Sequence, residues 1–276
     1  MSFVAAEHAR RPANGLHRAR IVAIANQKGG VGKTTTAVNL ATALAAVGRR
    51  VLVIDLDPQG NATTGLGIRR EARAGTSYKL LVGETELESA VLATPVPRLS
   101  LVPSSPDLAG AELEVSDRER REFLLSRAVR SRVGSYDDVL IDCPPSLNLL
   151  TVNALVAADR VIVPLQCEFY ALEGLAQLME TIERVRQALN PRLALEGVLL
   201  TMYDRRNNLC EMVAADVRGH FGDKVYDTVI PRNVRISEAP SHGLPVLIYD
   251  HRCSGSQAYM QLAGEVLRRG AAESRA

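Results

Sequence analysis

The chain has 276 residues, 46% of them hydrophobic and 23% charged, and its formal net charge is +2. This length and composition are those of a folded globular protein with one α/β domain, and they exclude the disordered and fibrous classes. The small net charge excludes a strong positive field over the whole surface, and the lack of a run of about 18 apolar residues or a signal stretch predicts a cytoplasmic protein.

The first residues predict a tail, a strand and a turn. Residues 1–20 contain four arginines among Ala, Gly and Pro without sustained periodicity, so we expect a flexible basic N-terminal tail. The apolar run Ile21–Ala25 predicts a buried strand. Gln27–Lys33 follows it as a glycine-rich turn.

A helix and a second strand come next. Apolar residues recur at helical spacing from Ala37 to Val47, and Gly48 is placed to end that helix. The run Val51–Ile54 predicts a strand that closes at Asp55. Strand, glycine-rich turn, helix and strand together predict a βαβ unit with parallel strands.

The rest of the chain continues this alternation. Further apolar runs predict strands at Leu99–Val102, Val139–Ile141, Val161–Leu165, Val198–Leu200, Val229–Ile230 and Val246–Ile248. Amphipathic helices are predicted from Leu172 to Leu189 and over Gln257–Arg268. We therefore predict one α/β domain at 21–270, with a mostly parallel twisted sheet covered by helices on both faces, and a short C-terminal tail at 271–276.

The turn after the first strand has the chemistry of a phosphate-binding loop. Its glycines let successive backbone amides face a phosphate, and the start of the following helix adds free N–H groups and a positive dipole. Lys33 is placed to neutralise the β- and γ-phosphates, and Thr34 to bind Mg²⁺. The nucleotide-binding residues predicted here are Lys28, Gly29, Gly30, Val31, Gly32, Lys33, Thr34 and Thr35.

Lys28 departs from the ordinary Walker A pattern, because it opens the loop where that pattern has glycine. A second lysine near Lys33 adds like-charge repulsion unless its ammonium serves another phosphate. This position predicts a special role for Lys28.

Two aspartates extend the predicted site. Asp57 follows the second strand, and Asp142 ends a later one. Ligands of open α/β sheets gather at the carboxyl ends of the strands, so both carboxylates are expected to face the γ-phosphate and Mg²⁺. An aspartate before proline is also a common turn former, and this structural alternative stays open for each.

The four cysteines are widely separated and show no CxxC spacing. Reduced cysteines without a metal are therefore expected at Cys143, Cys167, Cys210 and Cys253.

Four motifs resemble the ParA/Soj group of deviant Walker A P-loop NTPases: KGGVGKTT at 28–35, DLDPQGNAT at 55–63, IDCPPS at 141–146 and IPRNVRISEAPSHG at 230–243. The resemblance runs from about residue 21 to residue 267. It implies a P-loop ATPase with ATP and Mg²⁺ that is slow alone and is stimulated by DNA and a partner.

The resemblance assigns roles to matching positions. Lys28 looks like the signature lysine that reaches the partner's ATP in a homodimer, which makes it catalytic together with Lys33. Asp57 matches the acid that positions the attacking water and lies near the metal, and Asp142 matches the Walker B acid of the Mg²⁺ shell. Pro231 and Asn233 match the segment that holds adenine.

Arg206 and Arg235 match the residues that family members use for sequence-independent DNA contact. Local charge supports this only weakly, because residues 201–235 carry six Lys or Arg and five Asp or Glu. Solvated surface pairs are the structural alternative.

The function implied is DNA partitioning, with ATP-dependent dimerisation, non-specific DNA binding and a ParB-like centromere-binding partner at the nucleoid. A MinD-like membrane ATPase is one alternative, but the tail after Gly264 offers too small an apolar face for a membrane. A redox iron–sulfur relative and a nucleotide-gated scaffold with negligible hydrolysis are the others. Whether the cargo is a chromosome or a plasmid stays open.

Overall fold

The computed structural model describes residues 18–169 and 171–273. One sheet runs through the described chain in the order β3-β4-β2-β5-β1-β6-β7. Every neighbouring pair is parallel except β3 and β4, which are antiparallel. The strands are β1 (Arg20–Ile24), β2 (Val51–Asp55), β3 (Leu92–Ala93), β4 (Leu99–Val102), β5 (Asp138–Asp142), β6 (Arg160–Gln166) and β7 (Ala194–Thr201).

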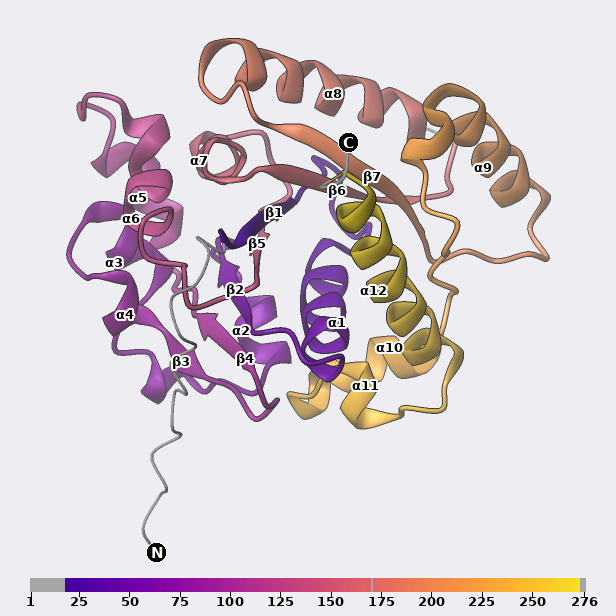
Figure 1. The fold of residues 1–276 in the computed structure, drawn as a ribbon, viewed down its shortest axis with the longest axis horizontal. Coiled ribbons are helices and arrows are strands. Elements are labelled where there is room, and N and C mark those ends of the chain that lie inside the picture. The colour runs from indigo at the N-terminus through magenta and orange to yellow at the C-terminus, as the bar shows by residue number, and fades with distance from the viewer. Residues whose placement is uncertain (1–17, 170, 274–276) are drawn as a thin grey trace, which may run out of the picture.

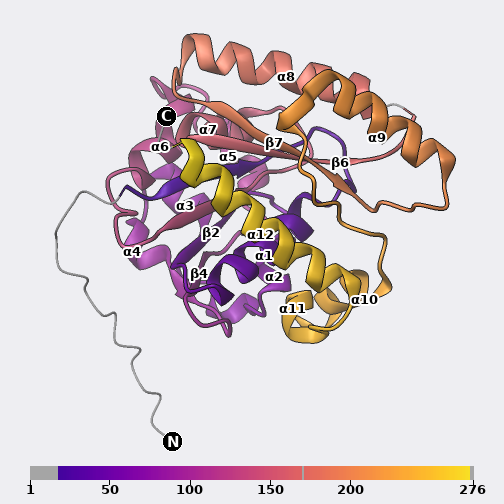
Figure 2. The same ribbon diagram turned by 45° about the vertical axis from the view of Figure 1, so that its right-hand side comes forward.

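Helices cover both faces of the sheet, with α1 and α12 side by side on one face and α7 and α8 on the other (Figures 1 and 2). The helices are α1 (Lys33–Ala46), α2 (Asn61–Gly65), α3 (Ser77–Val82), α4 (Leu87–Ala90), α5 (Leu108–Glu114), α6 (Leu124–Val129), α7 (Leu149–Ala157), α8 (Ala171–Ala188), α9 (Asn208–Phe221), α10 (Val234–Glu238), α11 (Val246–Tyr249) and α12 (Ser254–Glu273). Short 3₁₀ turns lie at Arg70–Ala72, Arg121–Phe123, Gly222–Lys224 and Ala239–His242.

Alternate residues of the central strand separate two apolar cores. Val22 and Ile24 of β1 pack with α1 and α12, whereas Ile21 and Ala23 face α7 and α8. Successive strand residues point to opposite faces, so a strand that is apolar at every position is buried on both sides. The predicted α/β class, the single domain and the covered parallel sheet are confirmed.

Two predicted strands are wrong. Val246–Ile248 lies in α11, because Pro245 begins that helix and the Val246 amide donates to Asn39 Oδ1 over 2.8 Å instead of joining a sheet. Val229–Ile230 forms no strand. In this described region the chain makes only isolated bridges, from Val225 to Val198 within β7 and from Pro231 to Tyr203 just after it.

The domain boundaries also shift slightly. Arg20, placed in the tail by its composition, is the first residue of β1, and Ala19 is buried. The tail proper, 1–17, lies outside the described residues, as do 274–276. The last helix extends to Glu273, beyond the predicted boundary at 270.

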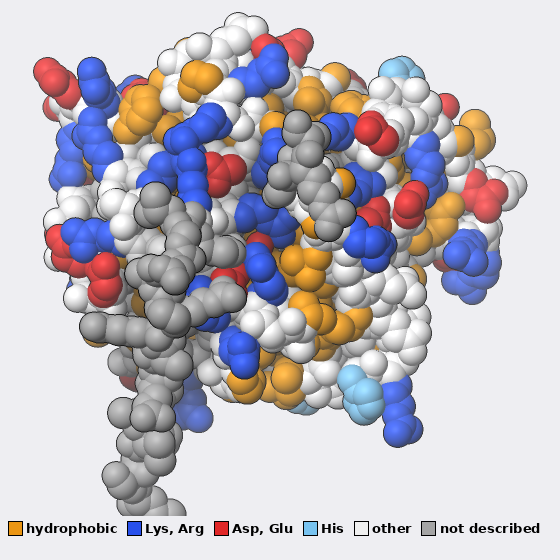
Figure 3. Space-filling view, viewed as in Figure 1, with side chains coloured by type: hydrophobic (Ala, Val, Ile, Leu, Met, Phe, Trp, Pro, Cys, Tyr) orange, Lys and Arg blue, Asp and Glu red, His pale blue; other side chains and the backbone are white. Residues whose placement is uncertain are grey.

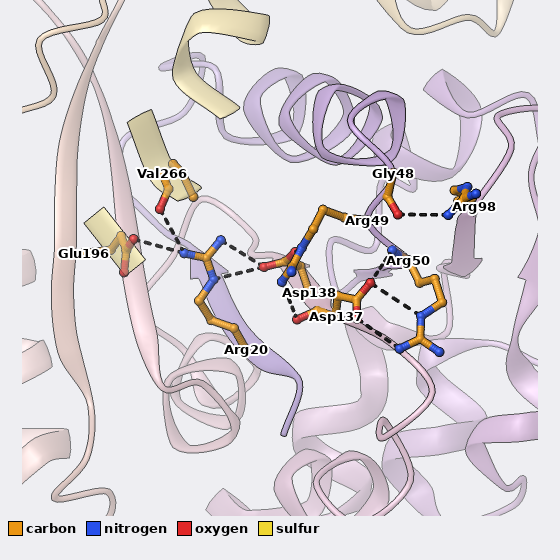
Figure 4. A network of polar contacts seen from close by, with 9 residues as sticks. All are labelled: Arg20, Gly48, Arg49, Arg50, Arg98, Asp137, Asp138, Glu196 and Val266. Carbon is orange, nitrogen blue, oxygen red and sulfur yellow. Dashed lines mark hydrogen bonds and ion pairs between the residues drawn. The ribbon is translucent and has the colours of Figure 1, made fainter. Parts of the chain in front are cut away.

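A network of arginines and acids ties together the N-terminal ends of the strands (Figure 4). Asp138 is fully buried and accepts from Arg20 Nε at 3.0 Å and from Arg49 Nε at 2.7 Å. Asp137 pairs with Arg50 at 2.9 Å. These contacts join β1, β2 and β5 at the edge opposite the carboxyl ends of the strands.

Candidate nucleotide and DNA site

The loop between β1 and α1 is shaped to hold a phosphate. Gly30 and Gly32 have φ values of 75° and 88°, in the left-handed region that favours glycine. Gly32 is the N-cap of α1 and offers no side chain to bind the first amides of the helix. These N–H groups stay available to an anion, and the helix dipole favours negative charge there.

Buried polar side chains hold this loop in place. Thr201 Oγ1, at the end of β7, donates to the Val31 carbonyl over 2.8 Å. Asn26 donates to the Pro164 carbonyl at 2.8 Å and accepts the Lys28 amide at 3.0 Å. The loop is therefore anchored to β6 and β7.

Lys33 lies inside the loop that it closes. It is only 6% exposed, and its Nζ donates to the Lys28 carbonyl over 2.8 Å. Burial lowers the pKa of Lys33, while the negative charge of Asp142 acts in the opposite direction. An incoming phosphate would supply the negative charge that favours the ammonium form.

Lys28 points to a different partner. Its ammonium forms an ion pair with the Glu168 carboxylate, just after β6. Both side chains are a little over 40% exposed, so the pair lies at the surface beside the phosphate loop. In this conformation Lys28 is held by its own chain.

The sheet register brings the acidic residues to the same edge. Asp142, the last residue of β5, lies beside Asp55 of β2 and beside Ile24 of β1, where the phosphate loop begins. Asp57 follows Asp55 by two residues and is 7% exposed. The structure thus places both predicted acids next to the loop.

Asp142 is fully buried, and neither of its oxygens has a hydrogen bond of good geometry among the described residues. Burial raises its pKa well above the usual range, and the negative charge of Asp55 adds to the effect; Thr34 and Lys33 oppose it. A buried carboxylate that makes no hydrogen bond of good geometry among the described residues and lies beside the Thr34 hydroxyl fits a hard cation that binds oxygen, such as Mg²⁺.

A groove of about 630 Å³ lies beyond the end of β7. Its lining includes Tyr203, Arg206 and Pro231, and a parallel bridge joins Tyr203 to Pro231. Asn233 caps α10 by accepting the Arg235 amide, and its Nδ2 donates to Ser254 Oγ over 2.9 Å. The predicted adenine segment therefore lies in contact with the residues that directly follow β7, the strand whose last residue anchors the phosphate loop.

Both predicted DNA arginines are exposed and paired with carboxylates. Arg206 forms a two-pronged contact with Asp204, at 3.0 and 2.9 Å. Arg235 pairs with Glu238 at 2.9 Å and with Asp250 at 3.5 Å. Basic and acidic side chains are interspersed on the face shown in Figure 3.

Comparison with known proteins decides the family. A family model described as an AAA domain matches residues 19–195. The chromosome partitioning protein ParA of Caulobacter vibrioides is 64% identical over 253 residues, which cover 91% of this chain and 94% of that protein. The chain belongs to the ParA/Soj family. The sporulation initiation inhibitor protein Soj of Bacillus subtilis, another member, is 53% identical, with 91% of this chain and 99% of Soj covered.

Solved structures agree with the fold of this ParA/Soj chain. The cobyrinic acid a,c-diamide synthase of Mycobacterium smegmatis, with bound ADP and magnesium, has a TM-score of 0.80 and 41% identity, covering 91% of this chain and 94% of that one. The cell division ATPase MinD of Pyrococcus furiosus has a TM-score of 0.76 and 27% identity, covering 90% and 98%. The resemblance deduced from the motifs is confirmed.

The sequence analysis did not predict several residues that support the candidate site of this ParA/Soj chain. Thr201 and Glu168 lie far along the chain from the loop that they contact, and no local pattern links them to it. Asn26 had a local sequence signal. A polar residue that directly follows a buried strand and precedes Lys28 indicates a structural role.

Proposed function

We propose that this ParA/Soj chain is an ATPase that forms a homodimer around ATP and Mg²⁺, binds DNA without sequence preference and partitions a chromosome or plasmid with a ParB-like partner. It would act in the cytoplasm, on the nucleoid. The family supports ATP hydrolysis in partitioning. The observation that supports the proposal most directly is an exposed Lys28 beside a preformed phosphate loop.

The residues of the nucleotide site would bind different parts of ATP and Mg²⁺. The amides from Gly29 to Thr35 and the Lys33 ammonium would bind the phosphates. Thr34, Asp57 and Asp142 would hold Mg²⁺, which when bound neutralises charge on the β- and γ-phosphates. Pro231 and Asn233 would hold the adenine.

Asp57 would direct the attacking water. Its Oδ1 accepts the Gln59 amide over 2.9 Å, which restricts the carboxylate, and Lys33 and Asp142 lie close enough for charge interactions with it. A fixed carboxylate at the mouth of a phosphate site can orient a water for in-line attack.

Lys28 would connect hydrolysis to dimerisation. In the single chain it pairs with Glu168, and in the dimer it would exchange this partner for the phosphates bound by the neighbouring subunit. An exposed ion pair contributes about 1 kcal/mol or less, so the exchange costs little. Loss of the γ-phosphate removes the shared ligand and favours separation.

Arg206 and Arg235 would contact DNA phosphates. Two subunits double these contacts, and non-specific affinity rises steeply with each phosphate neutralised. DNA binding would then follow the dimer and therefore the nucleotide.

The last helix favours DNA over a membrane surface. The apolar residues of α12, including Tyr259, Leu262 and Val266, are buried against the core that contains α1. Its apolar face is therefore already covered. No helix within residues 18–169 and 171–273 is long and apolar enough to cross a bilayer.

A DNA-binding assay tests the proposed switch. We expect plasmid DNA to bind with ATP and Mg²⁺ and to bind at least about tenfold more weakly with ADP and Mg²⁺. The double substitution Arg206→Ala and Arg235→Ala should weaken binding and flatten its salt dependence. Arg184→Ala, which removes an exposed arginine of α8, is the matched control. Equal DNA affinity with both nucleotides would reject the switch.

A further inference from the structure

Buried hydrogen bonds hold the backbone of Asp57 on both sides. Its amide donates to Asp55 Oδ1 over 3.2 Å, and its carbonyl accepts from Ser104 Oγ over 2.5 Å. Asp55 ends β2, and Ser104 lies shortly after β4; both are fully buried. Because β2 and β4 are neighbours in the sheet, Asp57 is fixed from two adjacent strands.

Thr63, in α2, joins these two contacts. Its hydroxyl donates to Asp55 Oδ2 over 2.6 Å and accepts the Ser104 amide over 3.0 Å. Its own amide donates to the same Asp55 oxygen at 2.8 Å. One fully buried hydroxyl thus closes a ring that runs from Asp57 through Asp55 and Thr63 to Ser104 and back.

The position of Asp57 matters for its proposed role. Asp57 follows β2 by two residues, at the same edge of the sheet as Asp142 and the start of the phosphate loop. A displacement of about 1 Å at a catalytic group can lower a rate roughly a hundredfold.

We infer that Thr63 and Ser104 are positioning residues for ATP hydrolysis, which hold Asp57 where it can direct water at the γ-phosphate. The inference rests on the proposed function of Asp57. Neither residue would touch the reacting atoms, because both are buried behind the Asp57 backbone. Their effect would pass through the ring of hydrogen bonds.

Matched substitutions separate positioning from folding. Thr63→Val removes the hydroxyl and keeps the branched shape, whereas Thr63→Ser keeps the hydroxyl. Ser104→Ala removes the hydroxyl that donates to the Asp57 carbonyl. It provides a second test if Thr63→Val is unstable. Thr64→Val is the control: its hydroxyl is on the same helix but donates to the Gly60 carbonyl, outside the ring.

Phosphate release is measured with saturating ATP, Mg²⁺ and plasmid DNA, alongside the KM for ATP and the ATP-dependent dimer mass. We expect Thr63→Val and Ser104→Ala to lower kcat about tenfold or more, with KM changed less than about threefold and dimerisation retained. Thr63→Ser and Thr64→Val should stay within about twofold of the unmodified chain.

Two results would overturn the inference. If kcat is unchanged in Thr63→Val or Ser104→Ala while Asp57→Ala is inactive, the ring does not position Asp57, and the proposed function stands. Equal losses in Thr63→Ser and Thr63→Val would show a structural role only. If Asp57→Ala hydrolyses ATP at the full rate, the proposed role of Asp57 fails together with the inference.

Discussion

Arg206 is held by a carboxylate of its own chain, and this contact would compete with the DNA phosphates of the proposed function. Asp204 accepts both the guanidinium and the Arg206 amide, and hydrogen bonds and charge from Arg206 lower the pKa of Asp204 to about 2. The carboxylate therefore stays ionised and paired at neutral pH. In the proposed function, DNA phosphates would have to displace this carboxylate from Arg206.

Removing this competitor should strengthen DNA binding. For Asp204→Asn we expect about a two- to fivefold gain in affinity for plasmid DNA with ATP, because solvent screens an exposed ion pair and its loss frees Arg206 at little cost. Glu180→Gln, which breaks the exposed ion pair with Arg184 on α8, is the matched control and should leave the DNA affinity unchanged. Weaker DNA binding by Asp204→Asn would contradict this interpretation of Arg206.

At the scale of elements, the end of β7 connects several parts of the site. Thr201 anchors the phosphate loop, Met202 has a positive φ of 49°, and Tyr203 then pairs with the Pro231 segment. The unusual backbone at Met202 turns the chain from the sheet toward Arg206. One short stretch of chain thus joins the phosphate loop, the predicted adenine segment and Arg206, one of the two proposed DNA contacts.

Thr201→Val should loosen the phosphate loop without changing the shape of the side chain. It leaves the buried Val31 carbonyl without its donor, at a cost of about 1–3 kcal/mol. Titration with ATP should show about tenfold weaker binding, and Thr201→Ser should bind normally. Thr181→Val, which removes a similar hydroxyl bond on α8, is the control. Unchanged ATP affinity in Thr201→Val would contradict the anchoring role.

The elements that the sequence predicted well are those with long apolar or periodic patterns. The strands at β1, β2, β4, β5 and β6, and the helices α1, α8 and α12, lie within a few residues of their expected positions. The strand predicted at Val246–Ile248 was wrong because three apolar residues are equally consistent with a buried strand and with a short helix. The hydrogen bond from the Val246 amide to Asn39 favours the helix, and it joins residues that are far apart in the chain.

The candidate site was predictable in part for the same reason. The phosphate loop and both acids lie in continuous motifs at strand ends, where topology brings them together. Thr63, Ser104, Glu168 and Thr201 act through tertiary hydrogen bonds, and their residue types are common in turns and helices. Such contacts appear only once the strand order is known.

At the scale of the whole molecule, ion pairs at the N-terminal ends of the strands stabilise the fold, whereas the candidate site lies at the carboxyl ends. Burial raises the pKa of Asp137, but the hydrogen bonds and charge of Arg50 outweigh it and lower the pKa to about 2. A folded-state pKa below the ordinary value stabilises the fold above about pH 4, and this contribution is lost as pH falls toward 2.

Asp137→Asn should therefore destabilise the protein by about 2 kcal/mol at pH 7, measured by denaturant unfolding. The difference in free energy of unfolding between Asp137→Asn and the unmodified chain should become smaller as pH falls from about 4 to about 2. Asp117→Asn, at an exposed aspartate outside this network, is the control. A difference that stays constant down to pH 2 would contradict the assigned role of the Asp137 carboxylate.

The central claim is that the nucleotide bound by each subunit of a dimer is also contacted by Lys28 of the other subunit. Its most direct test is the mass of the Asp57→Ala variant in solution with ATP and Mg²⁺, measured by light scattering at high protein concentration. We predict twice the chain mass of 29.9 kDa with ATP, and the single-chain mass with ADP or when Lys28→Ala is added. A single-chain mass with ATP, or dimerisation that persists without Lys28, would contradict the account.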